Sequence, residues 1–247
     1  MTRAILRVSG PDAVTFLQGL VTNDVRKLAD ARILYAALLT PQGKYLADFF
    51  LVADGDDILI DLDVSLADDV ALRLNRYKLR SQVSIARDEL AVSRGTGPAP
   101  DGALPDPRNP ALGWRLYGAA LPDDGTDWTA LHVAHAIPQS GAELVPDDSY
   151  ILEHGFERLH GVDFRKGCYV GQEVTARMHH KTELRKGLTV VGLSGPVPFG
   201  TPILAGGKEA GEVLTQSGAQ ALAYLRFDRA TPVMQAGDAT VTWSGSA

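Results

Sequence analysis

Cysteine is almost absent from this chain. Cys168 is the one cysteine among 247 residues, which excludes an internal disulfide and a zinc site built from several thiolates. A single thiol is typical of a reducing compartment. No apolar run approaches the roughly 18 residues that span a bilayer, and the first residues lack the apolar core of a signal peptide. We therefore predict a cytoplasmic protein that does not contact a membrane.

Positive charge is also scarce. The chain has 24 Lys+Arg against 30 Asp+Glu, a net charge of −6 with neutral histidines, which argues against a general nucleic-acid-binding protein. It has no Walker loop, no G-x-S-x-G turn and no HExxH pair, so the usual sequence signatures of P-loop hydrolases, serine hydrolases and zinc proteases are missing. With 45% hydrophobic residues, the chain is long enough to fold around its own core.

The hydrophobic pattern predicts a sheet-rich α+β arrangement in the first part of the chain. Alternating apolar residues favour strands, two of which form a hairpin around Pro41-Gln42-Gly43. Apolar residues three and four positions apart favour helices, with Ser9 and Ser65 as N-cap residues. The predicted strands are residues 3–8, 33–40, 44–52, 58–63, 83–86 and 90–93, and the predicted helices are one that opens at 9–12 and one over 65–79.

Proline and glycine mark a change at residues 95–110, where five prolines and three glycines predict a surface loop or linker. Two short helices are predicted beyond it, at 128–137 and 156–160. From Lys186 onward, short apolar segments separated by glycines predict a small all-β domain, either a sandwich or a barrel. The strands predicted in this second part are 114–117, 188–193, 202–204, 211–214, 221–227 and 239–243.

The densest chemical segment surrounds Cys168. Lys166 lies two residues before it and would favour the thiolate, and a helix that begins near Gly171 would bring the positive end of its dipole close. These features are typical of a reactive thiol. A buried structural cysteine in a tight turn remains the other interpretation.

The segment Lys166-Gly167-Cys168-Tyr169-Val170-Gly171-Gln172-Glu173 resembles the signature of the YgfZ-type folate-binding family, which is related to the aminomethyltransferase (T-protein) of the glycine cleavage system. Further segments resemble other motifs of that family, so the likeness extends over most of the chain. They are Phe16–Val25, Gln42-Gly43-Lys44 followed by Asp48, Asp106-Pro107-Arg108, and Gly113-Trp114-Arg115.

The resemblance implies an α+β fold of the T-protein type. Such chains form a ring of three β-rich subdomains, antiparallel sheets with a few helices, around a central folate-sized hole, with a small C-terminal β-barrel. By this comparison, residues 1–50 and 105–184 form an interleaved folate-binding region that carries the Cys motif. Residues 51–104 form an α+β subdomain, and residues 185–247 form the barrel.

The resemblance also implies a tetrahydrofolate site, occupied by tetrahydrofolate or a one-carbon derivative. Asp48 matches a T-protein carboxylate that contacts folate, and a carboxylate can orient a pterin ring by accepting its N–H hydrogen bonds. Tyr35, across the hairpin, could stack on the ring or bond to it. The other interpretations are that Asp48 faces solvent and that Tyr35 is only a half-buried strand tyrosine. Asn23 and Asp24 are also assigned to folate binding, and the other interpretation is that they only cap a turn.

Folate binding is further assigned to Gly171, Gln172, Glu173 and Arg177. Arg177 also opens the strongest basic cluster, which is either a solvated face or an anion site for the glutamate tail of folate or for a phosphate backbone. The cluster consists of Arg177, His179, His180, Lys181, Arg185 and Lys186. No metal site is predicted, because adjacent histidines on a helix diverge and His132 and His135 have no third ligand nearby.

The resulting hypothesis is a monomeric, tetrahydrofolate-binding accessory protein for iron–sulfur cluster assembly or repair. Its implied partners are iron–sulfur client enzymes, including radical enzymes that modify tRNA, and assembly proteins. Cys168, Lys166 and Asp48 are the residues expected to carry its chemistry, and whether that chemistry is enzymatic stays open. The alternatives are a folate-dependent aminomethyltransferase and an RNA-contacting module that uses residues 177–186, against which the net charge argues.

Overall fold

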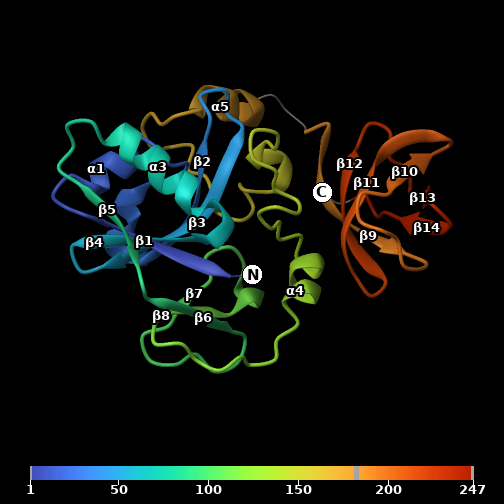
Figure 1. The fold of residues 1–247 in the computed structure, drawn as a ribbon. Helices are drawn as coiled ribbons and strands as arrows, with labels where there is room; N and C mark the ends of the chain where they lie inside the picture. The colour runs from blue at the N-terminus through green and yellow to red at the C-terminus, as the bar shows by residue number, and fades with distance from the viewer. Residues whose placement is uncertain (1, 181–183, 246–247) are drawn as a thin grey trace. The chain divides into compact units, whose positions relative to one another are not determined.

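The computed structural model describes residues 2–180 and 184–245 (Figure 1). The chain divides into two compact units, and neither is a continuous stretch of sequence. The first unit contains residues 1–126, 146–148 and 156–174, and the second contains residues 127–145, 149–155 and 175–247. The division into three subdomains implied by the family resemblance stays a prediction.

An antiparallel sheet of order β2-β3-β4-β1-β5 forms the centre of the first unit (Figure 1). Every residue of β2 is buried, which explains why this strand is an unbroken apolar run rather than an alternating one. The predicted hairpin is confirmed, with Tyr35 opposite Phe50 and Ala37 opposite Asp48. The strands are β1 (Arg3–Ser9), β2 (Ile33–Leu39), β3 (Tyr45–Asp54), β4 (Asp57–Asp63) and β5 (Ser84–Asp88).

A second, three-stranded sheet of order β6-β8-β7 completes the strands of the first unit. It consists of β6 (Ala91–Gly95), β7 (Leu104–Pro105) and β8 (Trp114–Gly118). The Pro- and Gly-rich segment at 95–110, predicted as loop or linker, therefore contains a short strand. Leu104 and Pro105 pair with β8, and proline is tolerated there because β7 is an edge strand.

Helices of the first unit pack their apolar residues into one buried cluster with the five-stranded sheet. Leu17 of α1, Leu74 of α3 and Leu6 of β1 belong to this cluster and are at most 1% exposed. The α-helices are α1 (Ala13–Gln18), α2 (Leu28–Ala31) and α3 (Ala67–Lys78), and the 3-10 helices are η1 (Val25–Lys27), η2 (Val64–Leu66) and η3 (Pro110–Leu112).

The two predicted N-caps are wrong. Ser9 pairs with Ser84 as the last residue of β1, which keeps it extended, and Asp12 takes the cap position of α1. Before α3, the Asp63 carboxylate accepts a hydrogen bond from the Ser65 backbone N–H at 2.9 Å and caps a 3-10 turn. Asp63, at the end of β4, therefore provides the cap that the sequence analysis assigned to Ser65.

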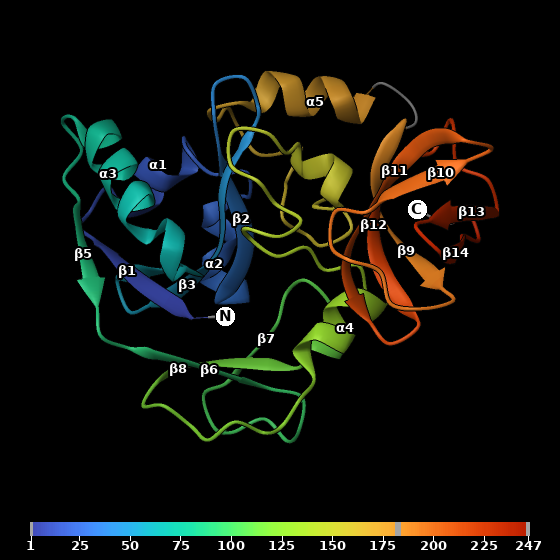
Figure 2. The same cartoon turned by 45° about the vertical axis from the view of Figure 1, so that its right-hand side comes forward.

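The second unit is built on a closed barrel of order β10-β11-β12-β9-β14-β13 (Figure 2). Its interior is apolar, with Val191, Ile203 and Leu225 at most 1% exposed. This confirms the all-β prediction for the C-terminal part as a barrel. The strands are β9 (Lys186–Leu193), β10 (Pro202–Ala205), β11 (Lys208–Ser217), β12 (Gln220–Arg226), β13 (Val233–Ala236) and β14 (Ala239–Thr242).

Short helices accompany the barrel. In α4 (Trp128–Ala134), Val133 packs with Leu214 and Leu222 of the barrel. The helix predicted at 156–160 is wrong: a 3-10 helix, η4 (Ile151–His154), precedes it and ends at Gly155, whose φ of 75° no helix continues. The last helix, α5 (Gln172–His180), follows the Cys168 segment. No helix in the described part of the chain is both long and apolar enough to cross a bilayer.

Candidate functional site

Asp48 lies inside the β2–β3 hairpin and is only 5% exposed, which contradicts the solvent-facing interpretation. The Tyr45 hydroxyl donates to its Oδ1 at 2.7 Å, and the Tyr35 hydroxyl donates to its Oδ2 at 2.9 Å. Both tyrosines are fully buried. Both carboxylate oxygens of Asp48 are thus oriented by tyrosine hydroxyls inside the hairpin.

Tyr35 is held rigidly in the hairpin. Its ring stacks on Phe156 with centroids 5.0 Å apart, and the Arg108 guanidinium lies 5.4 Å from its centroid. Burial raises the pKa of the Tyr35 phenol well above its ordinary value, and the charge of Asp48 raises it further. Tyr35 therefore remains protonated at neutral pH and acts only as a donor toward Asp48.

Two buried carboxylates that the sequence reasoning had not assigned lie in the same unit. Asp61 is bound by Arg3 and Arg115, each at 2.6 Å, and Asp106 is bound by Arg108 at 2.8 Å. Burial by itself would raise the pKa of Asp61, but the charges of Arg3 and Arg115 outweigh it and hold the pKa below its ordinary value. Asp61 and Asp106 are therefore ionised at neutral pH.

The Phe50 ring, opposite Tyr35 in the hairpin, connects this network to Asp48. The guanidinium of Arg115 lies 3.9 Å and that of Arg108 lies 4.8 Å from its centroid. Phe50 and Tyr35 are themselves 5.4 Å apart. The Tyr35–Asp48 pair therefore lies next to the Phe50 ring, and the guanidinium groups of two buried arginines contact that ring. The sequence signal that could have found Asp61 is the one that found Asp48. Each is an aspartate inside an apolar strand, β4 for Asp61 and β3 for Asp48.

Lys166 anchors the Cys168 segment to the turn after α1. Its ammonium group donates to the backbone carbonyls of Gln18, Val21 and Asn23, at 2.8 Å and 2.9 Å for the first and last, and the residue is 4% exposed. Burial lowers the pKa of Lys166 to about 8, partly opposed by the charges of Asp24 and Asp163. The effect of Lys166 on the Cys168 thiol stays a prediction.

We expect Lys166→Met to change the pH dependence of stability. Between pH 8 and about 10.4 the unfolded chain binds one proton more than the folded chain at this site, so the free energy of unfolding of the wild type rises with pH by about 3 kcal/mol. The variant lacks this rise and, because three carbonyls lose their donor, is less stable by about 1–3 kcal/mol at neutral pH.

Urea unfolding at pH 7, 8, 9 and 10 measures both quantities, and Lys208→Met, at an exposed position of the barrel, is the control. If the free energy of unfolding changed with pH equally in the wild type and in Lys166→Met, Lys166 would not be a buried charged group.

The Cys168 thiol is exposed and free of any disulfide, which contradicts the buried structural interpretation. Its segment is held on both sides. Lys166 is bound as described, and Gly171 has a φ of 83° and lies so close to the hairpin that a Cβ there would be 2.5 Å from the Thr40 carbonyl oxygen. Helix α5 starts at Gln172, as predicted. The Cys168 side chain is therefore exposed to solvent on a segment whose two ends are held by Lys166 and Gly171.

Asn23 links the two parts of the site within the first unit. Its side-chain amide donates to the backbone carbonyls of Tyr35 and His160, both at 2.8 Å, while the backbone carbonyl of Asn23 accepts from Lys166. Asp24 caps the turn that follows and pairs with Arg26 at 2.6 Å, and hydrogen bonds from Arg26 lower the pKa of Asp24 to about 2. Folate contacts of these two residues stay predictions.

The remaining predicted binding residues lie on α5 or beyond it. Glu173 and Arg177 are exposed on α5, Gln172 is half-buried, and Arg177 belongs to the second unit. In the predicted basic cluster, Lys186 is the first residue of β9 and pairs with Glu153 of η4 at 3.6 Å. Lys181 lies outside the described residues. His132 is buried in α4, and the described residues contain no group of His, Cys, Asp or Glu arranged to hold a metal ion.

Known proteins resemble this chain in sequence. Residues 185–246 match the family model described as CAF17, C-terminal beta-barrel domain. The mouse (Mus musculus) iron-sulfur cluster assembly factor IBA57, mitochondrial, is 32% identical, and the match covers 92% of this chain and 76% of the mouse protein. This chain belongs to the IBA57 family. The human (Homo sapiens) IBA57 is 31% identical over 90% of this chain and 75% of its own length.

Fungal IBA57 homologues are longer than this chain. The Mycosarcoma maydis homologue is 34% identical over 74% of this chain but only 54% of its own length, so the chain spans about half the length of such relatives. The IBA57 relatives are named as mitochondrial proteins, and this contradicts the predicted cytoplasmic location. A lone thiol reports on redox conditions and does not distinguish one reducing compartment from another.

A solved structure identifies the fold. The glycine cleavage system aminomethyltransferase T from Bartonella henselae superposes with a TM-score of 0.73 over 98% of this chain and 83% of that chain, at 14% sequence identity. The predicted T-protein-like α+β fold with a C-terminal β-barrel is thereby confirmed for this IBA57-family chain.

Proposed function

We propose that this IBA57-family chain is a tetrahydrofolate-binding accessory protein for the assembly or repair of iron–sulfur clusters in client enzymes. The observation that carries the proposal is the exposed Cys168 on its anchored segment, in a chain whose relatives are named as iron–sulfur cluster assembly factors. We place the chain in the YgfZ-type branch of folate-binding proteins, with radical enzymes that modify tRNA among its clients, and we propose that it acts as a monomer.

Cys168 would act as one ligand of a cluster in transit. Iron–sulfur clusters are usually held by four thiolates, and this chain has one. The remaining ligands must then come from a partner protein or a client enzyme. A ligand that is exposed but fixed in position suits this role, because the partner can approach it without displacing the fold.

Asp48 would hold the pterin ring of tetrahydrofolate. Its carboxylate is buried and oriented by two tyrosine hydroxyls, and carboxylate oxygens are the groups that accept the N–H donors of a pterin ring. The residues therefore fit the group. When bound, the folate would supply one-carbon chemistry. Tyr35 would fix the direction of the carboxylate, and Asn23 would fix the strand that carries Tyr35.

A second candidate is a folate-dependent aminomethyltransferase, which the likeness to the Bartonella henselae fold favours. An assay for methylene-tetrahydrofolate formation separates the two functions. The RNA-contacting alternative rests on Arg177 and its neighbours, and the net charge of −6 argues against it. A salt-dependent affinity for tRNA would favour it instead.

Calorimetric titration with tetrahydrofolate under reducing conditions tests the folate site. We expect saturable binding that Asp48→Asn weakens by about 1–3 kcal/mol, because the variant replaces a charged acceptor by a neutral amide. Asp54→Asn, in the same strand but with a half-exposed carboxylate paired with Arg7, is the control and should bind as the wild type does. Thermal melting of both variants separates lost binding from lost folding.

Wild-type protein that binds no tetrahydrofolate would remove the folate from the proposal and leave the Cys168 role to be judged separately. Equal affinity of wild type and Asp48→Asn would place Asp48 outside the binding site.

A further inference from the structure

The end of α3 exposes large apolar side chains to solvent. Leu72 is 52% exposed, Tyr77 is 42% exposed and Leu79, directly after the helix, is 89% exposed. Their neighbours Val70 and Leu74 are at most 2% exposed, so the helix already has a separate face for the core. We call residues 72–80 the α3 patch. Within it, Leu74 belongs to the core of the first unit, whereas Leu72, Tyr77 and Leu79 are not among the buried core residues.

The α3 patch is also strongly basic. It contains Arg73, Arg76, Lys78 and Arg80, and no acidic residue occurs between Asp69 and Asp88 of a chain whose net charge is −6. Within residues 2–180 and 184–245, none of these four cations forms an ion pair. Cations at a helix C-terminus complement its dipole, which accounts for Arg76 and Lys78. It does not account for the exposed Leu72 and Leu79 beside them.

Leu79 has an unfavourable backbone as well as an exposed side chain. Its φ is 42° and its ψ is −103°, a region that residues with a Cβ rarely adopt and that glycine, the common residue at this end of a helix, enters freely. Leu79 therefore strains the backbone, and its side chain adds no buried apolar surface to the fold. Such a residue is expected where the side chain serves an interaction.

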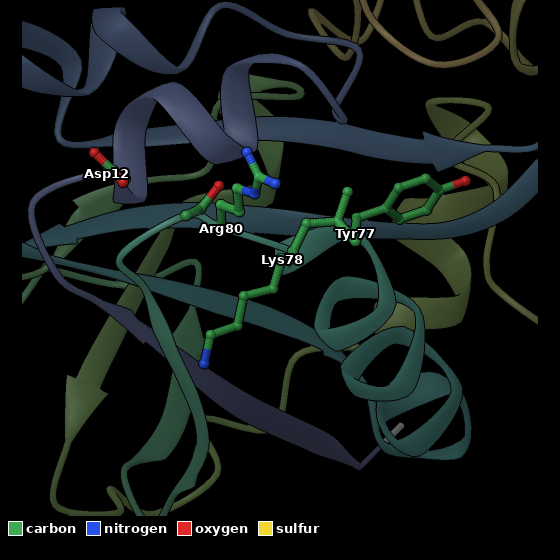
Figure 3. Close-up of a pocket in the computed structure, with 6 residues that line it drawn as sticks. Asp12, Tyr77, Lys78 and Arg80 are labelled. Atoms are coloured by element: carbon green, nitrogen blue, oxygen red, sulfur yellow. The ribbon is translucent and has the colours of Figure 1, made fainter.

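A hollow of about 680 Å³ opens at this end of the helix. Figure 3 shows the Tyr77 ring at one side and Asp12 at the other, with Lys78 and Arg80 between them. Asp12 is the one acidic residue among the six that line the hollow, and its Oδ2 accepts a hydrogen bond from the Gln82 backbone N–H at 2.7 Å. The hollow is larger than a simple ion requires and suits the side chains of a peptide.

We propose that the α3 patch docks an acidic segment of a partner protein that also carries apolar side chains. Charge complementarity identifies this occupant, because four cations flank apolar residues on an otherwise acidic molecule. Tyrosine and arginine are the residue types enriched at protein interfaces. Nucleic acid fits less well, since the patch offers one aromatic ring for stacking and two exposed leucines that phosphate does not contact. A lipid surface would leave the hollow unfilled.

This surface is independent of the proposed function, since none of its residues belongs to the Asp48 or Cys168 site. The probe is an array of short synthetic peptides in which glutamates and leucines are permuted, with matched arrays that carry lysine for glutamate or serine for leucine. Fluorescence anisotropy with the full chain measures the affinity. We expect the glutamate–leucine peptides to bind and both matched arrays to bind at least about tenfold more weakly.

Two variants test the patch itself. Arg76→Glu with Arg80→Glu should weaken binding at least about tenfold, while Lys208→Glu with Arg229→Glu, two exposed barrel cations, should not. Leu79→Gly should also weaken binding, yet its melting temperature should equal or exceed that of the wild type, because glycine removes the strain. Loss of binding in Leu79→Gly with a lowered melting temperature would contradict the argument.

The proposal is overturned if no peptide of the array binds, or if the lysine peptides bind as well as the glutamate peptides. It is also overturned if vesicles of phosphatidylglycerol or a single-stranded RNA oligonucleotide bind the wild type more tightly than the peptides and lose that binding in Arg76→Glu with Arg80→Glu. These outcomes would assign the patch to a lipid or to nucleic acid. Tetrahydrofolate titration of the same variants should be unchanged, which separates this proposal from the folate site.

Discussion

Cys168→Ala is expected to abolish the activity of iron–sulfur client enzymes in cells that depend on this chain, while the folded protein accumulates normally. The thiol is exposed, so its removal leaves no cavity and should change the free energy of unfolding by no more than about 0.5 kcal/mol. Its chemistry has no substitute, because the chain contains no second cysteine. Client enzyme activity and protein level are measured together in a strain that lacks the native gene.

Arg165→Ala is the matched control, because Arg165 is an exposed neighbour in the same segment and should support normal client activity. Cys168→Ser should fail like alanine if the sulfur ligates iron, since a hydroxyl is a poor ligand for a cluster. Normal client activity with Cys168→Ala at wild-type protein levels would remove this cysteine from the mechanism.

Asp61→Asn is expected to destabilise the protein by about 3–5 kcal/mol, the largest stability effect of any substitution proposed. Asp61 is fully buried between Arg3 and Arg115, and an amide in its place would remove the carboxylate that both guanidinium groups bind, leaving Arg115 with the carboxylate of Asp106 at 3.6 Å. The Tyr117 hydroxyl, which donates to Asp61 at 2.9 Å, would lose a charged acceptor as well. Urea unfolding at neutral pH measures the difference.

Asp57→Asn supplies the comparison, because Asp57 lies in the same strand and pairs with Arg7 where its side chain is 29% exposed. This control should cost less than about 1 kcal/mol. The pKa of Asp61 is lowered in the fold, so its contribution is fully present above the ordinary aspartate pKa of about 4 and is lost as pH falls through the folded pKa. The difference between wild type and Asp61→Asn should therefore shrink in acid. A difference no larger than that of Asp57→Asn would contradict a dry, charged Asp61.

Local sequence patterns determined most of the secondary structure. The hairpin follows from two apolar runs around Pro41-Gln42-Gly43, α3 from apolar residues three and four apart, and the all-β character of the C-terminal part from short strands separated by glycines. The failures were also local. The cap of the turn before α3 is Asp63 rather than Ser65, and the helix expected at 156–160 is displaced upstream, because a single Gly155 decides where the backbone turns.

The site was only half determined by sequence. The motif around Cys168 and the position of Asp48 could be named from the chain, because family resemblance is carried by residues near one another in sequence. What Lys166 does was decided by the fold: its ammonium group binds carbonyls about 145 residues earlier, although its neighbour in sequence is the cysteine segment. The pairing of Asp61 with Arg115 likewise joins residues 54 apart.

The physical reason is the range of the forces involved. Hydrophobic periodicity and turn residues act within a few positions, so the sequence by itself determined most of the strands, the main helix, the all-β character of the C-terminal part and the single thiol. Burial, desolvation and charge pairing depend on which distant segments meet. Only the tertiary structure decided that Asp48 is enclosed by two tyrosines, that Cys168 is exposed, and that the cations of the α3 patch stand beside leucines that the core does not use.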